Sequence, residues 1–266
     1  MTHASVELKK ILSNYLDIDT IFHIWEIGSR DGEDAKQMIE NFRAAKINSF
    51  EPNVDTFDKL LQICDASDGR IIANNFALSD TDGDITFYKI DTNKTETTWP
   101  DGNPGASSIF QSNGEYQIEK YVQIPVSIKS RTGRSLIKND NFPIPGFIWM
   151  DVQGAESVII QGLGEYLCEV ESLYIELSLK PVYAGQSLAP EVIDLLSKEF
   201  YWHSNLSTGN WQFDALFINK RHRNFNLIAR NFFLNLSLRS NIGIFIKENP
   251  IKLLVLETVK KFSRWR

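Results

Sequence analysis

Cysteine is scarce in this sequence: Cys64 and Cys168 are the only two among 266 residues. Their spacing matches neither a disulfide framework nor a metal-binding motif, so a disulfide-stapled scaffold is excluded and a reducing compartment is favoured. Long apolar runs are also missing, and none is long enough to span a bilayer. The opening residues lack the basic and then apolar pattern of a signal peptide. We therefore expect a cytoplasmic protein.

Acidic and basic residues are unevenly distributed along the chain. Residues 221–266 contain ten Lys or Arg and two acids, whereas the whole chain has 28 Lys or Arg and 34 Asp or Glu. Such an asymmetry is typical of an appended arm with its own partner. The remainder is long enough and, at 42% hydrophobic residues overall, apolar enough to bury a large core. We expect a globular domain over residues 1–220 and a basic extension over residues 221–266.

Part of this basic extension has the pattern of a helix. Asn249-Pro250 is a good helix start, and apolar residues follow at helical spacing, namely Ile251, Leu254, Val255, Val259 and Phe262. Basic side chains lie off this stripe. The helix could therefore pack against another subunit or the acidic domain, or lie peripherally on an anionic membrane surface. No motif that recognises bases accompanies the charge, so no nucleic-acid partner is expected.

The most informative segment is residues 145–162, where a buried strand leads directly into an acid-bearing turn and then a helix. The apolar run from Phe147 to Val152 is typical of a parallel strand covered on both faces. Asp151 then lies at the carboxyl edge of an α/β sheet, which is where ligands bind in such folds. Asp151 and Glu156 could also serve only to cap and charge the helix that follows.

Two further segments favour a ligand site over simple capping. Residues 21–27 form a second predicted strand, followed by the loop Gly28-Ser29-Arg30-Asp31-Gly32 and an amphipathic stretch from Asp34 to Ala45. A third strand, from Ile47, ends at Glu51, 25 positions after Glu26. This is close to the spacing at which nucleoside-binding folds place a carboxylate on the ribose hydroxyls. The sequence therefore predicts a ligand that contains ribose.

The first loop discriminates between ribose-containing ligands. A dinucleotide-binding loop needs a second glycine close to the pyrophosphate and a third for helix packing, but Arg30 and Glu33 occupy those positions. S-adenosylmethionine carries no phosphate and has a sulfonium cation, which suits a cleft lined by acids. The acids concerned are Glu26, Asp31, Glu51 and Asp151.

Five segments in this order resemble the FkbM-type family of S-adenosylmethionine-dependent methyltransferases, from about Trp25 to about Gly185. They are Glu26 to Gly32, Phe50 to Asn53, Asn75 to Asp80, Ser107 to Ile109 and Met150 to Glu156. The family often has Lys two places before the acid, where this chain has Trp149, and the first motif has Glu-Ile-Gly-Ser instead of the common Asp-Ile-Gly-Ala.

The resemblance implies a fold, a cofactor and a set of site residues. The expected fold is a Rossmann-like class I methyltransferase, with a seven-stranded, mostly parallel sheet whose last strand is antiparallel. Later elements fit it: strands at 173–177, 201–206 and 213–219, and a helix at 190–199. The resemblance implies that Glu26 and Gly28 hold the methionine end of S-adenosylmethionine, Glu51 the ribose and residues 75–77 the adenine rim. The full expected binding set is Glu26, Gly28, Ser29, Arg30, Asp31, Glu51, Pro52, Asn53, Asn75, Phe76, Ala77, Ser108, Asp151 and Gln153.

Residues 78–120 are expected to leave the regular pattern. Asp82-Gly83, between Leu78 and the run 85–88, predicts a hairpin turn. Residues 91–120 are long, polar and without periodicity, which favours a functional segment, interpreted here as a lid over the acceptor. Trp99 and Tyr116 within it suit stacking on a sugar acceptor. The alternative is a mobile loop with Trp99 buried in the core.

The proposed chemistry is O-methylation of a sugar hydroxyl on a glycan. Methyl transfer from a sulfonium needs alignment of the acceptor and removal of its proton. Asp151 and Glu176 are the candidate bases. No metal is expected, because ligands at recognisable spacing are too few, although Asp151 could hold one. An amine or carboxyl acceptor on a small metabolite, or a non-catalytic nucleoside-binding module, remains open. His203, within a predicted strand, is interpreted as a packing residue.

Overall fold

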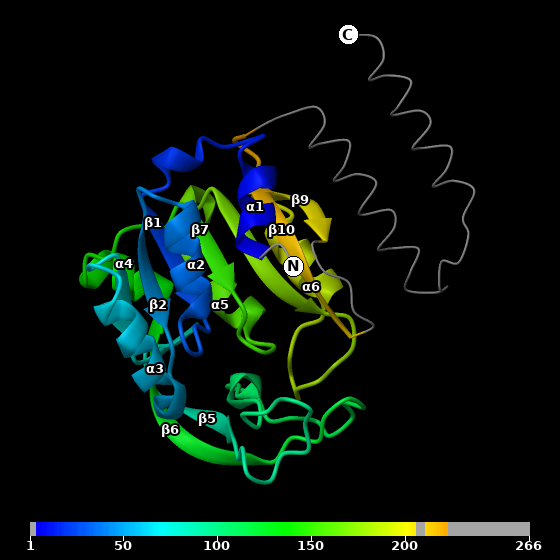
Figure 1. Cartoon of the computed structure of the whole chain (residues 1–266). Helices are drawn as coiled ribbons and strands as arrows, with labels where there is room; N and C mark the ends of the chain where they lie inside the picture. Colours follow the sequence, from blue (N-terminus) through cyan, green and yellow to red (C-terminus); the bar gives the residue numbers. More distant parts are fainter. Residues whose placement is uncertain (1–3, 206–210, 223–266) are drawn as a thin grey trace.

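The computed structural model describes residues 4–205 and 211–222 and contains a seven-stranded sheet at its centre (Figure 1). The strand order is β3-β2-β1-β7-β8-β10-β9, in which β10 is antiparallel to both neighbours and the other pairings are parallel. The predicted sheet is therefore confirmed. Its strands are β1 (His23–Ile27), β2 (Lys46–Phe50), β3 (Ile71–Asn74), β7 (Phe147–Met150), β8 (Ser172–Ser178), β9 (Phe200–Asn205) and β10 (Gln212–Asn219).

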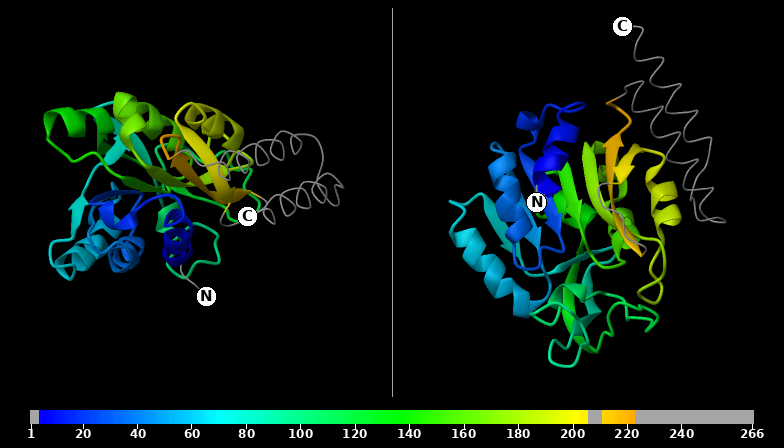
Figure 2. Two further views of the ribbon diagram at one scale, coloured as in Figure 1. Left: turned by 90° about the horizontal axis from the view of Figure 1, so that it is seen from above. Right: turned by 45° about the vertical axis from the view of Figure 1, so that its right-hand side comes forward.

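Helices cover both faces of this sheet (Figure 2). One face carries α1 (Ala4–Leu12), α2 (Glu33–Asn41) and α3 (Val54–Asp65). The other carries α4 (Gly133–Asn139), α5 (Glu156–Leu163) and α6 (Ala189–Leu196). Three short 3-10 helices, Ile18–Thr20, Pro104–Ala106 and Gly164–Glu169, lie in the connections. The helix predicted at 190–199 thus ends at Leu196.

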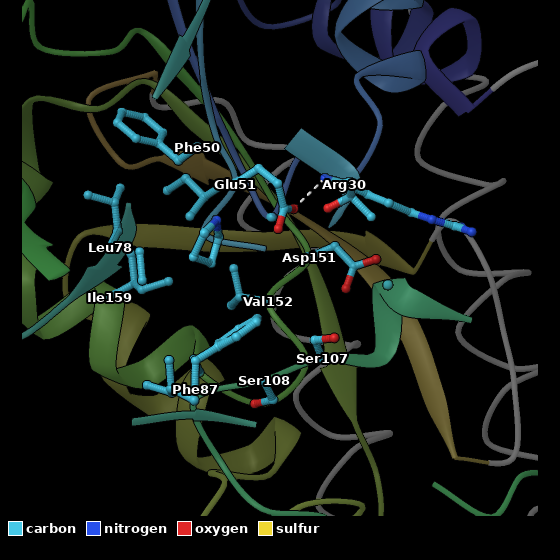
Figure 3. A pocket seen from close by; sticks show the side chains of 18 of the residues that line it. Arg30, Phe50, Glu51, Leu78, Phe87, Ser107, Ser108, Asp151, Val152 and Ile159 are labelled. Atoms are coloured by element: carbon cyan, nitrogen blue, oxygen red, sulfur yellow. Dashed lines mark hydrogen bonds between the residues drawn. The ribbon is translucent and has the colours of Figure 1, made fainter. Parts of the chain in front are cut away.

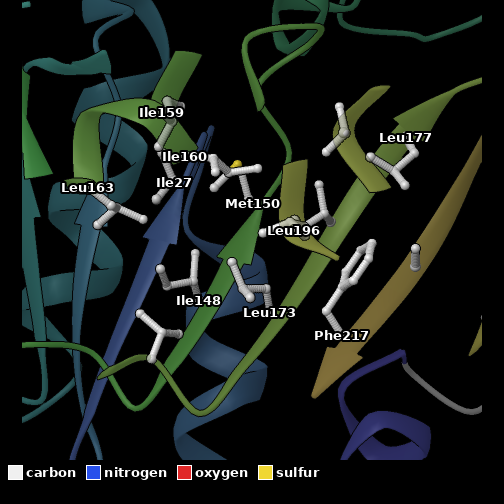
Figure 4. Close-up of a cluster of buried hydrophobic side chains, with 14 of the residues drawn as sticks. Ile27, Ile148, Met150, Ile159, Ile160, Leu163, Leu173, Leu177, Leu196 and Phe217 are labelled. Atoms are coloured by element: carbon white, nitrogen blue, oxygen red, sulfur yellow. The ribbon is translucent and has the colours of Figure 1, made fainter. Parts of the chain in front are cut away.

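The core consists of two hydrophobic clusters, one on each face of the sheet. Strand β7 supplies both, because alternate side chains of a strand point to opposite faces. Ile148 and Met150 pack with Ile159 of α5 (Figure 4), and Phe147 packs with the cluster under α1 and α2. All four side chains of β7, from Phe147 to Met150, are buried, which explains the unbroken apolar run in the sequence. Burying each side chain stabilises the fold by roughly 1.5–3 kcal/mol.

A second sheet of three strands lies at the carboxyl end of the large sheet (Figure 1). It contains β4 (Ala77–Ser79), β5 (Gly83–Ile90) and β6 (Gln123–Thr132) in the order β4-β6-β5. The predicted hairpin between residues 78 and 85 is wrong, since Ser130 of β6 pairs with both Ala77 and Gly83 and separates the two strands. Asp82 accepts hydrogen bonds from the Thr132 backbone (2.7 Å) and the Ser135 hydroxyl (2.7 Å), so the turn is bound to the start of α4.

The expected basic helical arm lies almost entirely outside the described residues, and its helix at 251–262 lies wholly outside them. Among the helices that the structure does describe, none combines the length and the apolar character needed to cross a membrane. His203, by contrast, is described. Its side chain is buried and lies 3.1 Å from the Tyr15 hydroxyl, as expected of a packing residue.

Candidate functional site

A cleft opens at the carboxyl ends of β1, β2 and β7 and is closed from below by the small sheet and residues 104–109 (Figure 3). Its empty volume is about 570 Å³, including the solvent at its mouth. One part is apolar and the other carries two carboxyl groups. The apolar wall is formed by Phe50, Phe76, Leu78, Phe87, Val152 and Ile159, and the carboxyl groups belong to Glu51 and Asp151. An apolar wall beside two carboxyl groups is the lining expected of a site for a nucleoside-type ligand.

The loop between β1 and α2 reverses the chain tightly enough to form one wall of this cleft. Gly28 (φ 84°), Arg30 (φ 51°) and Gly32 (φ 82°) all adopt left-handed backbone conformations. Gly28 has a second constraint, because a Cβ atom there would lie 1.8 Å from the Asp151 carbonyl oxygen. This position therefore requires glycine on both grounds.

Glu26 supports this loop from inside the protein. It is 1% exposed, and its carboxylate accepts hydrogen bonds from the hydroxyls of Ser29 and of Ser49 (2.6 Å). Burial raises its pKa to about 8, against the opposing effect of the two hydroxyls. Glu26 and Ser29 are not among the residues that line the cleft. Glu26 instead holds the β1–α2 loop through Ser29, from the side of the loop that faces away from the cleft.

Glu51, at the end of β2, is placed at the centre of the cleft. One carboxylate oxygen accepts the Arg30 backbone N–H (2.7 Å) and the other accepts that of Asn53 (2.7 Å). The group is 6% exposed, and burial raises its pKa to about 7. Each carboxylate oxygen has two lone pairs and so retains one for a further donor. This arrangement suits two vicinal hydroxyl groups.

The structure separates the other expected binding residues into two sets. Pro52, Phe76 and Ala77 line the cleft. Three others are used to fix backbone. Asn53 caps α3 by accepting from the Asp55 N–H (3.1 Å), the Asn75 amide donates to the Glu51 carbonyl (2.9 Å), and Asp31 accepts weakly from the Glu33 N–H (3.5 Å).

Asp151 and Glu176 are brought together, as expected for strand-end residues of neighbouring strands. The Gln153 side-chain amide joins them, donating to Asp151 Oδ1 (2.6 Å) and Glu176 Oε2 (3.4 Å). Gln153 itself has φ 54°, an uncommon conformation for a non-glycine residue. Its side-chain oxygen accepts from the Tyr183 hydroxyl (3.1 Å), and its carbonyl accepts from the Ser108 hydroxyl (2.8 Å). Gln153 is thus the hub of the polar network.

The two carboxyl groups differ in their tendency to ionise. Enclosure raises the pKa of Asp151 to about 6, so it is mostly ionised at neutral pH. The pKa of Glu176 is raised well above its ordinary value, first by burial and then by the charges of Asp151 and Asp214. Asp214 is the cross-strand partner of Glu176. No group of three potential ligands that could hold a metal ion is found in residues 4–205 and 211–222.

Arg30 links the first loop to the segment 91–120. Its guanidinium forms an ion pair with Asp101 and lies over the Trp99 ring, 5.2 Å from the centroid. Trp99 is 51% exposed, so the alternative that it is buried in the core is wrong.

Glu119 orders the same segment from within. This buried carboxylate accepts from the Thr97 hydroxyl, the Asn103 amide (2.9 Å) and the Tyr121 hydroxyl (2.7 Å). No sequence pattern indicates Glu119, because its partners are 22, 16 and 2 residues away and follow no period. The segment is a hydrogen-bonded wall of the site.

Comparisons with known proteins agree with this geometry. The family described as "Methyltransferase FkbM domain" matches residues 26–201. The hexuronic acid methyltransferase AglP of Haloferax volcanii is 27% identical over 154 residues, 58% of this chain and 55% of that protein, so the alignment spans about half of its length. The 2-O-methyltransferase NoeI of Sinorhizobium fredii is 29% identical over 175 residues, 65% of this chain and 70% of that protein.

Solved structures are similar at a lower level. A putative O-methyltransferase from Klebsiella pneumoniae superposes with a TM-score of 0.46 and 10% identity, covering 82% of each chain. The family match, by contrast, covers most of the described sheet and every residue that forms the polar end of the cleft. The chain therefore belongs to the FkbM family of S-adenosylmethionine-dependent methyltransferases.

Proposed function

We propose that this protein transfers the methyl group of S-adenosylmethionine to a hydroxyl group of a sugar within a glycan or glycoconjugate. The observation that carries the proposal is the position of Asp151, which faces the cleft on one side and joins the network of Gln153 and Glu176 on the other. Donor and acceptor can therefore meet at a single carboxylate.

The cleft fits the donor by its chemistry. Glu51 has a free lone pair on each oxygen for the two ribose hydroxyls, and the apolar wall around Phe50 and Phe76 suits the adenine ring. Bound S-adenosylmethionine supplies an activated methyl group on a cationic sulfur. Asp151 provides the negative charge beside which such a cation is favourable.

The printed names of two relatives support a sugar acceptor. One is a hexuronic acid methyltransferase and the other a 2-O-methyltransferase. Hydroxyl acceptors need a base, and Asp151, with a pKa of about 6, is ionised and able to accept a proton at neutral pH. Such a base contributes on the order of 10²–10⁴-fold to the rate. Glu176, protonated more readily, orients the acceptor through a hydrogen bond.

Methyl transfer breaks one bond, forms one bond and moves one proton. The sulfur–methyl bond breaks, the methyl–oxygen bond forms, and the hydroxyl proton passes to Asp151. Gln153 holds Asp151 in place throughout, because its amide donates to Oδ1 at 2.6 Å. Alignment of two bound reactants can lower the barrier by roughly 7–11 kcal/mol, so the larger part of the catalysis is positioning.

The test uses methyl-labelled S-adenosylmethionine with the full chain and a panel of uronic acid and neutral glycosides. Mass spectrometry should find glycosides heavier by one labelled methyl substitution, and Asp151→Asn should form this product at least about a hundredfold more slowly. Calorimetric titration with S-adenosylhomocysteine is run in parallel. Donor-product binding without any methylated glycoside would point to an amine or carboxyl acceptor, and absence of binding would point to a non-catalytic module.

The basic extension has a separate proposal, which rests on the sequence alone. Its excess of Lys and Arg contrasts with an overall net charge of −6, so we propose that it contacts another subunit or an anionic membrane. Removing residues 246–266 should leave donor binding unchanged. Gel filtration and liposome flotation distinguish the two partners, and no change in either would mean that the extension packs on its own domain.

A further inference from the structure

Three distant segments meet beside Asp151 and Glu176, on the side away from the ribose carboxylate Glu51. They are residues 112–121, 179–184 and 211–212, and Figure 2 shows the first two side by side below the large sheet. Ser112 forms a bridge with Tyr183, and the Asn113 amide donates to the Pro181 carbonyl (2.9 Å). The backbone N–H of Leu179 donates to the Trp211 carbonyl (2.6 Å). Residues far apart in the sequence thus form one surface.

Aromatic side chains from all three segments form a row along this surface. Tyr183 stacks on Tyr121, with centroids 6.2 Å apart, and Tyr121 contacts Tyr116 at 5.7 Å. Tyr116 meets Trp211 edge to face at 5.2 Å. Tyr183 is 1% exposed, whereas Tyr116 and Trp211 are only partly buried. The row therefore extends from the interior of the site to solvent.

Both ends of the row are tied to the candidate catalytic carboxyls. At the inner end, the Tyr183 hydroxyl donates to the side chain of Gln153, which itself holds Asp151. At the outer end, Gln212, next to Trp211, donates to Glu176 Oε2 (2.8 Å). A ring placed against Tyr116 and Trp211 thus lies at the Glu176 end of the row, and Asp151 lies at the Tyr183 end.

A cation completes this surface. Lys180 Nζ lies 4.7 Å from the centroid of the Trp211 ring, and its side chain is exposed. Within residues 4–205 and 211–222, no carboxylate forms an ion pair with it. Burial favours the neutral form of Glu176, which reduces the negative charge that an anionic ligand would meet at this site.

We propose that Tyr116, Trp211 and Lys180 form the acceptor subsite, and that this subsite takes a pyranose ring bearing a carboxylate. The proposal rests on the proposed function and specifies its acceptor. The C–H face of a pyranose packs against exposed aromatic rings, with hydroxyls left for the amides and carboxyls beside them. Lys180 supplies the charge that distinguishes a uronate from a neutral hexose.

Saturation-transfer NMR on the full chain with bound S-adenosylhomocysteine tests this inference. The probes are methyl glucuronide and methyl glucoside, which differ only in the group on the ring carbon C5, a carboxylate in the first and a hydroxymethyl group in the second. Wild-type protein should bind both and prefer the glucuronide by about two- to fivefold, as expected for a partly exposed ion pair. Trp211→Ala should lose both signals. Lys180→Gln should remove the preference and keep glucoside binding.

Matched controls are available on distant surfaces. Phe22→Ala removes an exposed aromatic ring, and Lys198→Gln removes an exposed Lys, so both should behave as wild type. Tyr116→Ala repeats the aromatic test if Trp211→Ala does not fold. Unchanged glycoside binding in the aromatic variants, no binding to wild type, or an unchanged preference in Lys180→Gln would each overturn the subsite. If the wild-type protein does not bind S-adenosylhomocysteine, the proposed function itself is overturned.

Discussion

The backbone of Gly28 lies so close to that of Asp151 that the two strand-end loops of the site are in direct contact. A Cβ atom on Gly28 would lie 1.8 Å from the Asp151 carbonyl oxygen and 2.8 Å from its carbonyl carbon. The Asp151 N–H in turn donates to the Ile27 carbonyl (3.0 Å). The loop that begins at Gly28 and the turn that begins at Asp151 are therefore packed together as one unit.

Gly28→Ala should abolish donor binding, because the added methyl group forces this unit apart. The φ of 84° adds backbone strain to the clash. Gly69→Ala is the matched control, since Gly69 has a similar φ of 71° but nothing within 4 Å of a Cβ atom. Calorimetry with S-adenosylhomocysteine and thermal unfolding should show both variants destabilised and Gly28→Ala alone unable to bind. Normal binding by Gly28→Ala would contradict the contact.

Glu51→Gln should weaken donor binding by at least about tenfold. The amide nitrogen cannot accept a hydrogen bond, so one of the two backbone donors, Arg30 or Asn53, and one ribose hydroxyl lose their acceptor. Hydrogen bonds to a charged group contribute roughly 1.5–3 kcal/mol each. Glu40→Gln, on an exposed face of α2, is the control. If calorimetry gives Glu51→Gln and Glu40→Gln the same affinity for S-adenosylhomocysteine, Glu51 does not bind the ribose.

Apolar runs predicted six of the seven strands of the large sheet, because buried strands leave continuous runs such as Phe147 to Met150. The seven-stranded topology followed from the family resemblance, and no strand was predicted at β3. The small sheet was not predicted. β6 has an exposed face and an irregular burial pattern, and its pairing with β4 spans about fifty residues. An Asp-Gly pair is a local signal, and here the long-range partner determined the strand order.

The site residues also divide into those that strand ends predict and those that depend on long-range contacts. Strand-end acids such as Glu51 and Asp151 follow from topology, since carboxyl ends of parallel strands meet at one edge. Asn53 and Asn75 lie at the expected edge, but their side chains are bound to backbone. Gln212 was not identified at all, because its contact with Glu176 depends on an antiparallel register that the sequence does not specify.

Glu26→Gln should make stability less dependent on pH. The folded protein keeps the Glu26 proton up to a pKa of about 8, whereas an unfolded chain loses it near 4.5. Stability from this group is therefore present at low pH and is lost as pH rises from 4.5 to 8. A single such group changes the free energy of unfolding by up to about 1.4 kcal/mol per pH unit.

Urea unfolding of the unliganded protein at pH 4.5 and pH 8 measures this effect. The free energy of unfolding of Glu26→Gln minus that of wild type should be more positive at pH 8 than at pH 4.5, by about 2 kcal/mol or more. Glu40→Gln again serves as the control. An identical pH dependence in Glu26→Gln and wild type would mean that Glu26 is ionised throughout and held by Ser29 and Ser49.

Glu119→Ala should loosen residues 95–121 and leave the donor site intact. The Thr97, Asn103 and Tyr121 side chains would lose their common acceptor, at a cost of about 1–3 kcal/mol for each that stays buried. Hydrogen exchange should accelerate across the segment, and the KM for the acceptor should rise more than that for the donor. Glu96→Gln, in an exposed pair with Lys120 of the same segment, should change neither. Equal exchange rates would show that other contacts order the wall.

Asp151→Asn should keep the fold and slow methyl transfer by at least about a hundredfold, because the amide cannot accept the acceptor's proton. Wild-type turnover should rise with pH through about 6, where Asp151 ionises, and this rise should vanish in Asp151→Asn. Glu176→Gln preserves a neutral hydrogen-bonding group and should affect mainly acceptor KM. Single-turnover rates and donor titrations on both variants decide between them. If Glu176→Gln shows the larger loss of turnover and Asp151→Asn mainly loses donor affinity, Glu176 is the base and Asp151 orients the donor.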